Sequence, residues 1–195
     1  HGTNRRQRQM CIRDRNRFTY LYEEFDPTGT NKGNPLPANS GYNYTNFDFS
    51  FDSDDSKDFT YRVNPSFGKF YNGHKTSFDI ELRQRIRPKF TSSVEMKFDK
   101  VNLPKPNSTA NIFLIAPRFD FTFTKNLYWA TLLQYSNQSD NLSLNARLQW
   151  RFAPLSDLFL VYNDNYFTEN RYDSIFIPRV TNRSINLKLT YWLDI

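Results

Sequence analysis

The clearest pattern in the chain is a strict alternation of apolar and polar residues between Leu142 and Phe152. Leucine, alanine, tryptophan and phenylalanine occupy every second position, and serine, asparagine, glutamine and arginine occupy the positions between them. Because successive side chains point to opposite sides only in an extended strand, this spacing predicts a strand with one apolar and one polar face. A tilted strand that crosses a bilayer needs about 9–11 residues, which is the length of this segment.

The same alternation recurs along the chain and predicts further strands. No window shows a comparable stripe at the helical period, so we expect no helix. The predicted strands are 17–25, 42–52, 59–67, 77–87, 90–101, 112–124, 127–136, 142–152, 158–163 and 183–195. Most of them are longer than the roughly 5–6 residues usual for a strand, which argues against a soluble β-sandwich.

The connections between these strands alternate in length. The short ones are 53–57, 88–89, 125–126 and 153–157, and the long ones are 26–41, 102–111, 137–141 and 164–182. The exception is 71–74, where an Asn-Gly pair predicts a tight turn in place of a long loop. Short turns at one edge and long loops at the other are typical of outer-membrane barrels. We therefore predict an all-β, antiparallel up-and-down transmembrane β-barrel of about ten strands, complete or the C-terminal part of a larger one.

Composition agrees with a barrel although the chain is polar overall. The mean hydropathy is −0.74, and the chain has no run of 18 or more apolar residues that could form a transmembrane helix. A barrel needs only one apolar face per strand, because its interior and its loops are polar. The aromatic content of 17% suits the aromatic girdles that flank the apolar band of such barrels.

Residues 1–15 differ from the rest of the chain. They carry five Arg, one Asp and the single Cys, and Met10–Arg15 resembles the translated end of a transposon used to build sequencing libraries. We interpret 1–15 as a non-native scar and 16–195 as the barrel region, and the rival interpretation is a basic arm for nucleic acid or anionic lipid. Without 1–15 the net charge falls from +6 to +2, which gives little reason to expect a polyanionic partner.

The polar faces of the predicted strands carry charged side chains that would line the lumen of a barrel. Charges on adjacent strands come within pairing distance, so we expect a ladder of ion pairs, and a charged constriction that selects solutes is the alternative. The lumen-facing candidates are Asp79, Glu81, Arg83, Arg85, Arg118, Arg147 and Arg151.

Residues with catalytic potential are scarce. His74 is isolated on a predicted turn, and Asp52, Asp54 and Asp55 lack the spacing of a calcium loop. Asp79 and Glu81 could in principle serve as an acid–base pair, but the neighbouring Arg residues favour a structural role. We therefore expect no catalytic, cofactor or metal site, and no nucleic-acid partner, since basic residues are not grouped with stacking aromatics.

The segment Leu132–Asn165, LLQYSNQSDNLSLNARLQWRFAPLSDLFLVYNDN, is similar to the C-terminal part of a family of uncharacterised bacterial envelope proteins. Members join an N-terminal carbohydrate-binding-like domain to a membrane-associated β-barrel region and are often labelled hydrolases. The resemblance implies the outer membrane of a Gram-negative bacterium of the Bacteroidetes type. The N-terminal domain of the family is absent from this sequence. The matching positions are Gln134, Tyr135, Asn145, Arg147, Trp150, Pro154 and 156–163, with further similarity at Gly68, 71–73, 103–104 and 188–191.

These patterns together predict an outer-membrane β-barrel fragment without enzymatic activity, which serves as an anchor, a pore or a component of glycan uptake. Its expected partners are outer-membrane lipid and glycans, the latter bound by the long loops or by the absent N-terminal domain. The alternative is a soluble or surface-attached β-sheet module that binds carbohydrate through its aromatic residues.

Overall fold

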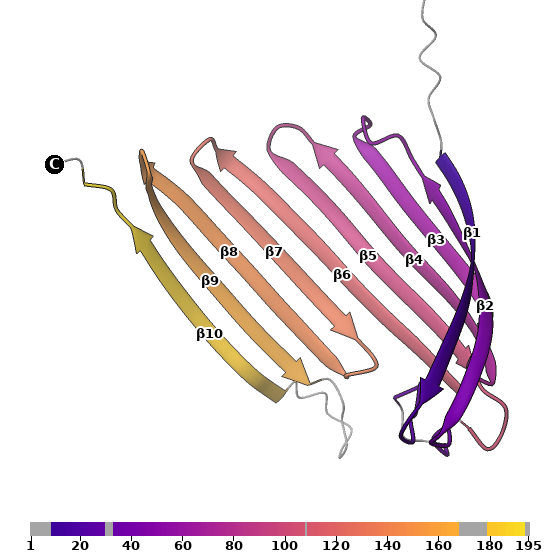
Figure 1. Cartoon of the computed structure of the whole chain (residues 1–195). Coiled ribbons are helices and arrows are strands. Elements are labelled where there is room, and N and C mark those ends of the chain that lie inside the picture. Colours follow the sequence, from indigo (N-terminus) through magenta and orange to yellow (C-terminus); the bar gives the residue numbers. More distant parts are fainter. Residues whose placement is uncertain (1–8, 30–32, 108, 168–178, 194–195) are drawn as a thin grey trace, which may run out of the picture. The chain divides into compact units, whose positions relative to one another are not determined.

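The structure is a computed structural model that describes residues 9–29, 33–107, 109–167 and 179–193. In these ranges the regular elements are ten β-strands, which pair in the order of the sequence (Figure 1). They are β1 Gln9–Leu21, β2 Ser40–Asp52, β3 Phe59–Phe70, β4 Gly73–Ile86, β5 Phe90–Asn102, β6 Thr109–Thr124, β7 Leu127–Ser136, β8 Asn141–Ala153, β9 Ser156–Phe167 and β10 Arg179–Thr190.

The prediction of an all-β, antiparallel up-and-down sheet is confirmed. The register between neighbours is antiparallel for β1–β2, β2–β3, β6–β7, β7–β8, β8–β9 and β9–β10. The strand order runs from β1 to β10, and among the described residues these two strands do not pair with each other. The structure therefore shows an antiparallel up-and-down sheet, and closure of this sheet into a transmembrane barrel stays a prediction.

Most strands lie where the alternation predicts them, and β7 has the predicted bounds. The first strand differs, because β1 begins at Gln9 inside the predicted scar and ends at Leu21. Its backbone pairs with β2 residue by residue, from Gln9 opposite Asp52 to Leu21 opposite Ser40. Backbone pairing along an available sheet edge needs no apolar alternation, so the side-chain pattern did not reveal it.

The last two strands also differ from the prediction. β9 extends to Phe167, although Asn163, Asp164 and Asn165 are turn-forming residue types, because they pair with β8 on one side and β10 on the other. β10 ends at Thr190, and Ile195 lies outside the described residues. Beyond Thr190 the backbone N–H of Trp192 donates to the hydroxyl of Ser156 at 3.1 Å.

The hairpin between β3 and β4 is tight, as predicted, but its two central residues are Tyr71 and Asn72 and not the Asn-Gly pair. Tyr71 takes the left-handed conformation that such a turn requires, with φ of 51°. Gly73 lies within β4, where a Cβ atom would be only 2.1 Å from the carbonyl oxygen of Asn102. The backbone of β4 thus passes so close to that of Asn102 and Leu103 that only glycine fits at this strand position.

The chain forms two compact units, and each is described by itself. The first unit comprises His1–Glu81 and Met96–Phe113, and the second comprises Leu82–Glu95 and Leu114–Ile195. The first unit contains the most buried apolar side chains of the described residues. They come from the β1–β2 connection, from β2, from the end of β5 and the residue just beyond it, and from the start of β6, and they are Leu36, Tyr44, Val101, Leu103 and Ala110.

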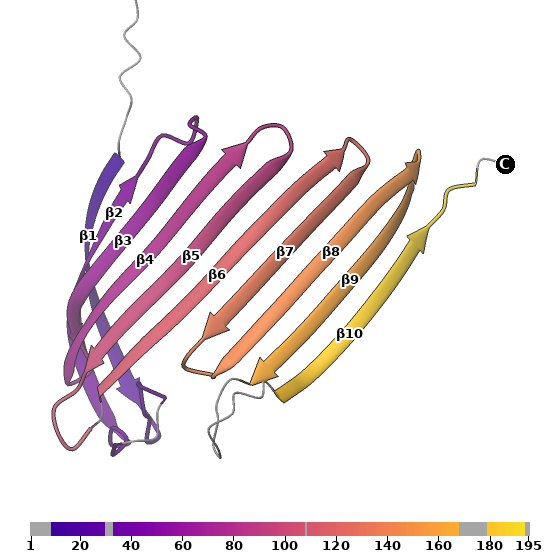
Figure 2. The ribbon, with the colours of Figure 1, turned by 180° about the vertical axis from the view of Figure 1, so that it is seen from behind.

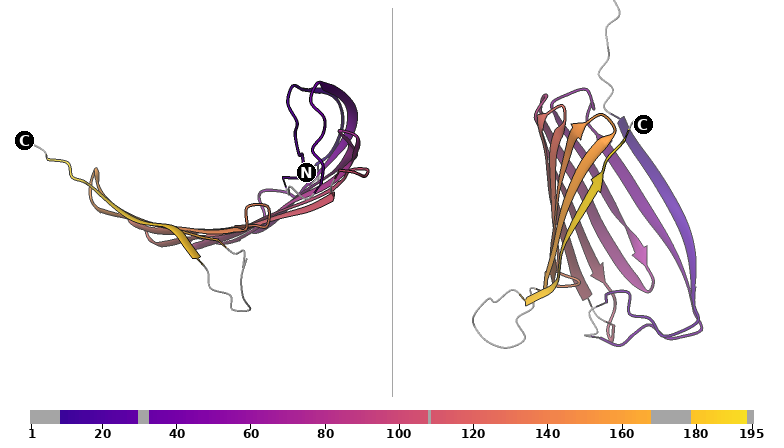
Figure 3. Two further views of the ribbon diagram at one scale, coloured as in Figure 1. Left: turned by 90° about the horizontal axis from the view of Figure 1, so that it is seen from below. Right: turned by 90° about the vertical axis from the view of Figure 1, so that its left-hand side faces the viewer.

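In the second unit, β7–β10 form a single layer. Figure 1 and the reverse view in Figure 2 show both faces of these four strands without another described element of the second unit lying across them. The edge-on view in the left panel of Figure 3 shows the same thin layer. Within the described residues of this unit, the side chains of these strands are therefore buried only by neighbouring side chains.

Candidate functional site

One face of the β7–β10 layer carries continuous rows of apolar side chains. Trp129 and Leu160 lie on either side of Leu148, and Leu187 follows Leu160 on β10. A second row consists of Leu127, Trp150, Leu158 and Leu189. The edge strand is the most open, with Leu187 68% and Leu189 63% exposed. Soluble monomers rarely leave a contiguous apolar surface of this kind in water.

The opposite face of the same strands is polar. Arg151 on β8 forms an ion pair with Asp157 on β9 at 3.2 Å. The amide of Asn145 donates to Asn163, and that of Asn163 donates to the hydroxyl of Ser184 at 3.3 Å. These contacts form a polar ladder across β8, β9 and β10, so the two faces of the layer suit different media.

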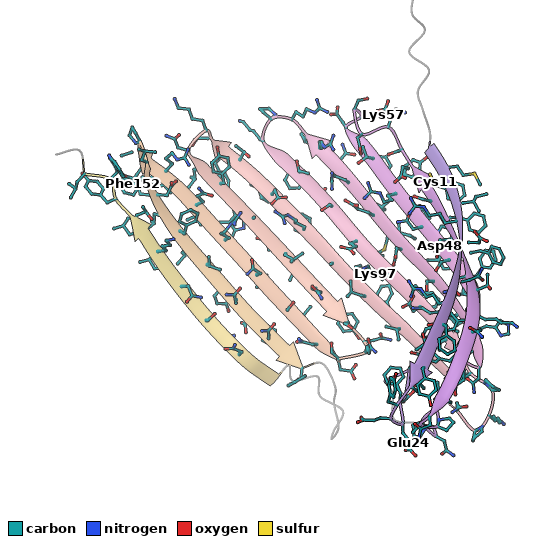
Figure 4. The ribbon with its side chains drawn as sticks, viewed as in Figure 1. Cys11, Glu24, Asp48, Lys57, Lys97 and Phe152 are labelled. Carbon is teal, nitrogen blue, oxygen red and sulfur yellow. The ribbon has the colours of Figure 1, made fainter. Side chains whose placement is uncertain are left out.

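The two acidic candidates, Asp79 and Glu81, lie on β4 in the first unit. Glu81 forms an ion pair with Arg62 at 3.2 Å, and Arg62 forms a second ion pair with Asp52 at 2.7 Å. Asp79 lines a polar depression of about 540 Å³ together with Asp48, which is labelled in Figure 4. This depression also includes Cys11 and Arg13, which belong to the predicted scar, and its other lining residues are Phe49, Ser50, Asp52, Asn64, Pro65 and Ser66.

The five arginine candidates lie in the second unit, on β4, β6 and β8. Arg118 forms a bidentate ion pair with Asp120 on its own strand, in which Nε donates to Oδ2 at 2.9 Å and Nη2 donates to Oδ1 at 3.0 Å. Arg147 is exposed, opposite Ala130 on β7 and Val161 on β9. Because the seven predicted residues are divided between the two units, a shared constriction stays a prediction.

A charged cluster on the apolar side of β9 was missed by the sequence reasoning. Asp164 has no solvent-accessible surface, and its Oδ2 accepts hydrogen bonds from Tyr162 at 2.6 Å and Tyr166 at 2.5 Å. Nε of Arg183 on β10 donates to the same oxygen at 2.9 Å. A layer this thin can cover the carboxylate only with side chains, and these three do so. The Tyr-Asn-Asp-Asn-Tyr spacing was the available signal, since it places all three β9 residues on one face.

In the first unit, the β1–β2, β3–β4 and β5–β6 connections pack against one another, and we call this group of connections the cap. Phe25 pairs with Leu36 through two backbone hydrogen bonds of 2.8 and 3.2 Å. Asn107 donates to the carbonyl oxygen of Asn34 at 2.8 Å and accepts from Asn72 at 2.9 Å. Three segments far apart in the sequence are thus tied together at the edge of the sheet that carries the long connections.

Aromatic rings form the inner side of this cap. The Tyr71 ring lies 5.4 to 5.9 Å from those of Tyr42, Tyr44 and Phe25, and 4.8 Å from that of Phe70. Burial raises the pKa of the Tyr71 hydroxyl, and the neighbouring Tyr44 and Tyr42 raise it further. The cluster is a compact aromatic surface that could stack on a flat apolar ligand.

No group of three or more His, Cys, Asp or Glu side chains lies close enough to hold a metal ion in the part of the chain that the structure describes. Within the same ranges, no helix has the length and apolar character needed to cross a membrane.

Comparison of the chain with protein-family models, with curated proteins and with solved structures found no match. The resemblance to bacterial envelope proteins therefore stays an expectation of the sequence.

Proposed function

We propose that this chain is a membrane-embedded region of a bacterial outer-membrane β-barrel, without enzymatic activity. The apolar faces of its strands contact lipid, and the polar faces line the interior. The region acts as an anchor or a pore wall, and glycan uptake is the transport process that the family resemblance favours.

The observation that carries this proposal is the uncovered apolar face of β8–β10. Trp150 is 48% exposed and Leu187 is 68% exposed, on the same face of a single layer. Transfer of such side chains from water to an apolar medium stabilises by about 25 cal/mol per Å². Lipid supplies that medium without a second layer of protein. It also permits strands of 12 or 13 residues, which cross a bilayer when tilted.

The polar face supports the second half of the proposal. The Arg151–Asp157 pair and the Asn145–Asn163 amide contact repeat across adjacent strands, as expected for a water-facing interior. Neither contact resembles a catalytic pair, because each group is held by a structural partner. An anchor or pore wall needs only this paired, hydrated surface.

Refolding of the full chain into phosphatidylcholine vesicles tests the proposal. We expect β-structure to form only when vesicles are present, protease protection of the strands, and a gel mobility that changes on boiling. Empty vesicles and the boiled chain serve as controls. A sharp, cooperative melting transition in water without lipid or detergent would contradict the membrane proposal.

The alternative function is a soluble or surface-attached module that binds carbohydrate. It is favoured by the aromatic cluster around Tyr71 beside a polar depression of about 190 Å³, which is lined in part by Arg17, Tyr44 and Phe70. Sugar rings stack on aromatic faces while their hydroxyls bond to polar groups. Binding of soluble oligosaccharides by the lipid-free, folded chain would favour this alternative.

A further inference from the structure

We propose that the face of the first unit that carries Phe47 and Phe67 has a binding site for a lipid with a phosphate headgroup, an inference that rests on the membrane function proposed above. The site is a depression of about 840 Å³ at the ends of β1–β4 near the β3–β4 hairpin. Its lining residues come from all four strands and include Phe18, Phe47, Phe67, Gly68, Lys69 and His74.

The floor of the depression is aromatic. Phe18 is 67% exposed, and Phe47 and Phe67 are 44% and 48% exposed, with the last two rings 5.9 Å apart. Phe47 and Phe67 face each other across β2 and β3. In a lipid-facing sheet these rings would pack against acyl chains, which lack polar groups to satisfy.

The rim of the depression is cationic and comes from the β3–β4 hairpin. Because the two-residue turn at Tyr71–Asn72 joins the strands, Lys69 and His74 lie opposite each other on the same face. Both side chains are exposed. The ammonium group of Lys69 supplies a positive charge, and the imidazole of His74 supplies an N–H donor, which together match a phosphate monoester.

Arg17 and neutral polar groups also line the depression, and no carboxylate is among the described residues that line it. The hydroxyl of Thr45 donates to the side-chain oxygen of Asn16 at 2.5 Å, and Asn43 lies next to them along β2. Asp14 shares this face of β1 but does not line the depression. An aromatic floor with a cationic rim has the polarity of an amphiphile whose headgroup is anionic.

Gly68 explains how the depression forms. A Cβ atom at this position would lie 2.3 Å from the carbonyl oxygen of Thr45, so only glycine permits the close approach of β3 to β2 here. The approach places Lys69 beside the aromatic floor, and the next residues turn back to bring in His74. The headgroup donors and the acyl surface are therefore fixed by backbone geometry.

The test uses the full chain refolded in neutral maltoside micelles, with bound lipid counted by native mass spectrometry. The probes are dihexanoyl phosphatidic acid, dihexanoyl phosphatidylcholine and inorganic phosphate. We expect phosphatidic acid to bind in preference to phosphatidylcholine, and the Lys69→Gln/His74→Gln double variant to lose about tenfold in phosphatidic acid affinity. Lys57→Gln, on the β2–β3 turn, is the matched control and should bind as the unaltered chain does (Figure 4).

The outcomes separate the two proposals. If the chain does not fold in micelles or vesicles, the membrane function and the lipid site both fail. If the chain folds but binds both lipids equally, or if the double variant and Lys57→Gln behave alike, only the lipid site fails. Competition by inorganic phosphate at the concentration at which phosphatidic acid binds would also overturn it, since the acyl chains would then contribute nothing.

Discussion

Exchange of the polarity of two adjacent residues in β8 tests which face of the sheet meets lipid. Leu148 lies between Trp129 on β7 and Leu160 on β9, and Arg147 lies on the opposite face. Leu148 is one residue from the centre of a strand of 13 residues. With a rise of about 3.3 Å and a tilt of about 40°, it lies about 2.5 Å from the bilayer midplane.

At that depth, Leu148→Arg should destabilise the inserted state by about 2–4 kcal/mol, which is roughly 30-fold to 700-fold in the folding equilibrium. Arg147→Leu should cost less, because it removes a charge from the water-facing side without placing one in lipid. The assay is reversible unfolding by guanidinium of the chain inserted in phosphatidylcholine vesicles. The free energies of unfolding of both variants and the unaltered chain are compared, provided that the slope of free energy against denaturant concentration is the same for all three. Equal losses at the two positions, or a larger loss for Arg147→Leu, would refute the facing assignment.

Three further substitutions probe other features by the same unfolding assay. Asp164→Asn should lower the midpoint, because the carboxylate that receives Arg183 and two tyrosines loses its charge, and an unchanged midpoint would mean that the cluster contributes nothing. Gly73→Ala should be strongly destabilising, since its methyl group would lie 2.1 Å from the carbonyl oxygen of Asn102; a neutral result would contradict that close approach. Leu36→Ala should cost about 2–5 kcal/mol if the cap folds as described, since Leu36 is fully buried, and a loss below about 1 kcal/mol would argue against the cap.

Much of the fold could be predicted from side-chain alternation alone. β7 has the predicted bounds, β2, β3, β5, β6 and β8 extend the predicted ranges by one to three residues, and β4 begins four residues earlier and ends one residue earlier than predicted. Side chains of an extended strand alternate between its two faces whatever the neighbouring strands are, so the strands can be recognised without knowing how they pair. The charged residues were placed on strands as predicted, but their ion-pair partners, such as Arg62 for Glu81, required the register between strands.

The candidate sites were less predictable. His74 was expected to be an isolated turn residue, and the structure places it in a depression beside Phe18 and Phe67, which come from other strands. The Asp164 cluster combines residues of β9 with Arg183 of β10. No pattern in a single strand specifies which residue of the next strand lies opposite, so these groupings emerge only when the strands pair.

The sequence by itself determined that this protein is all-β, that most of its strands are long, and that most of them have one apolar and one polar face. It did so because side-chain direction in a strand has a period of two residues. Only the tertiary structure decided the start of β1 at Gln9, the turn at Tyr71–Asn72 and the partners of Asp164. These features depend on backbone pairing and on close approach between segments that are distant in the sequence. A shift of one residue in the register would change them, and local sequence patterns do not encode the register.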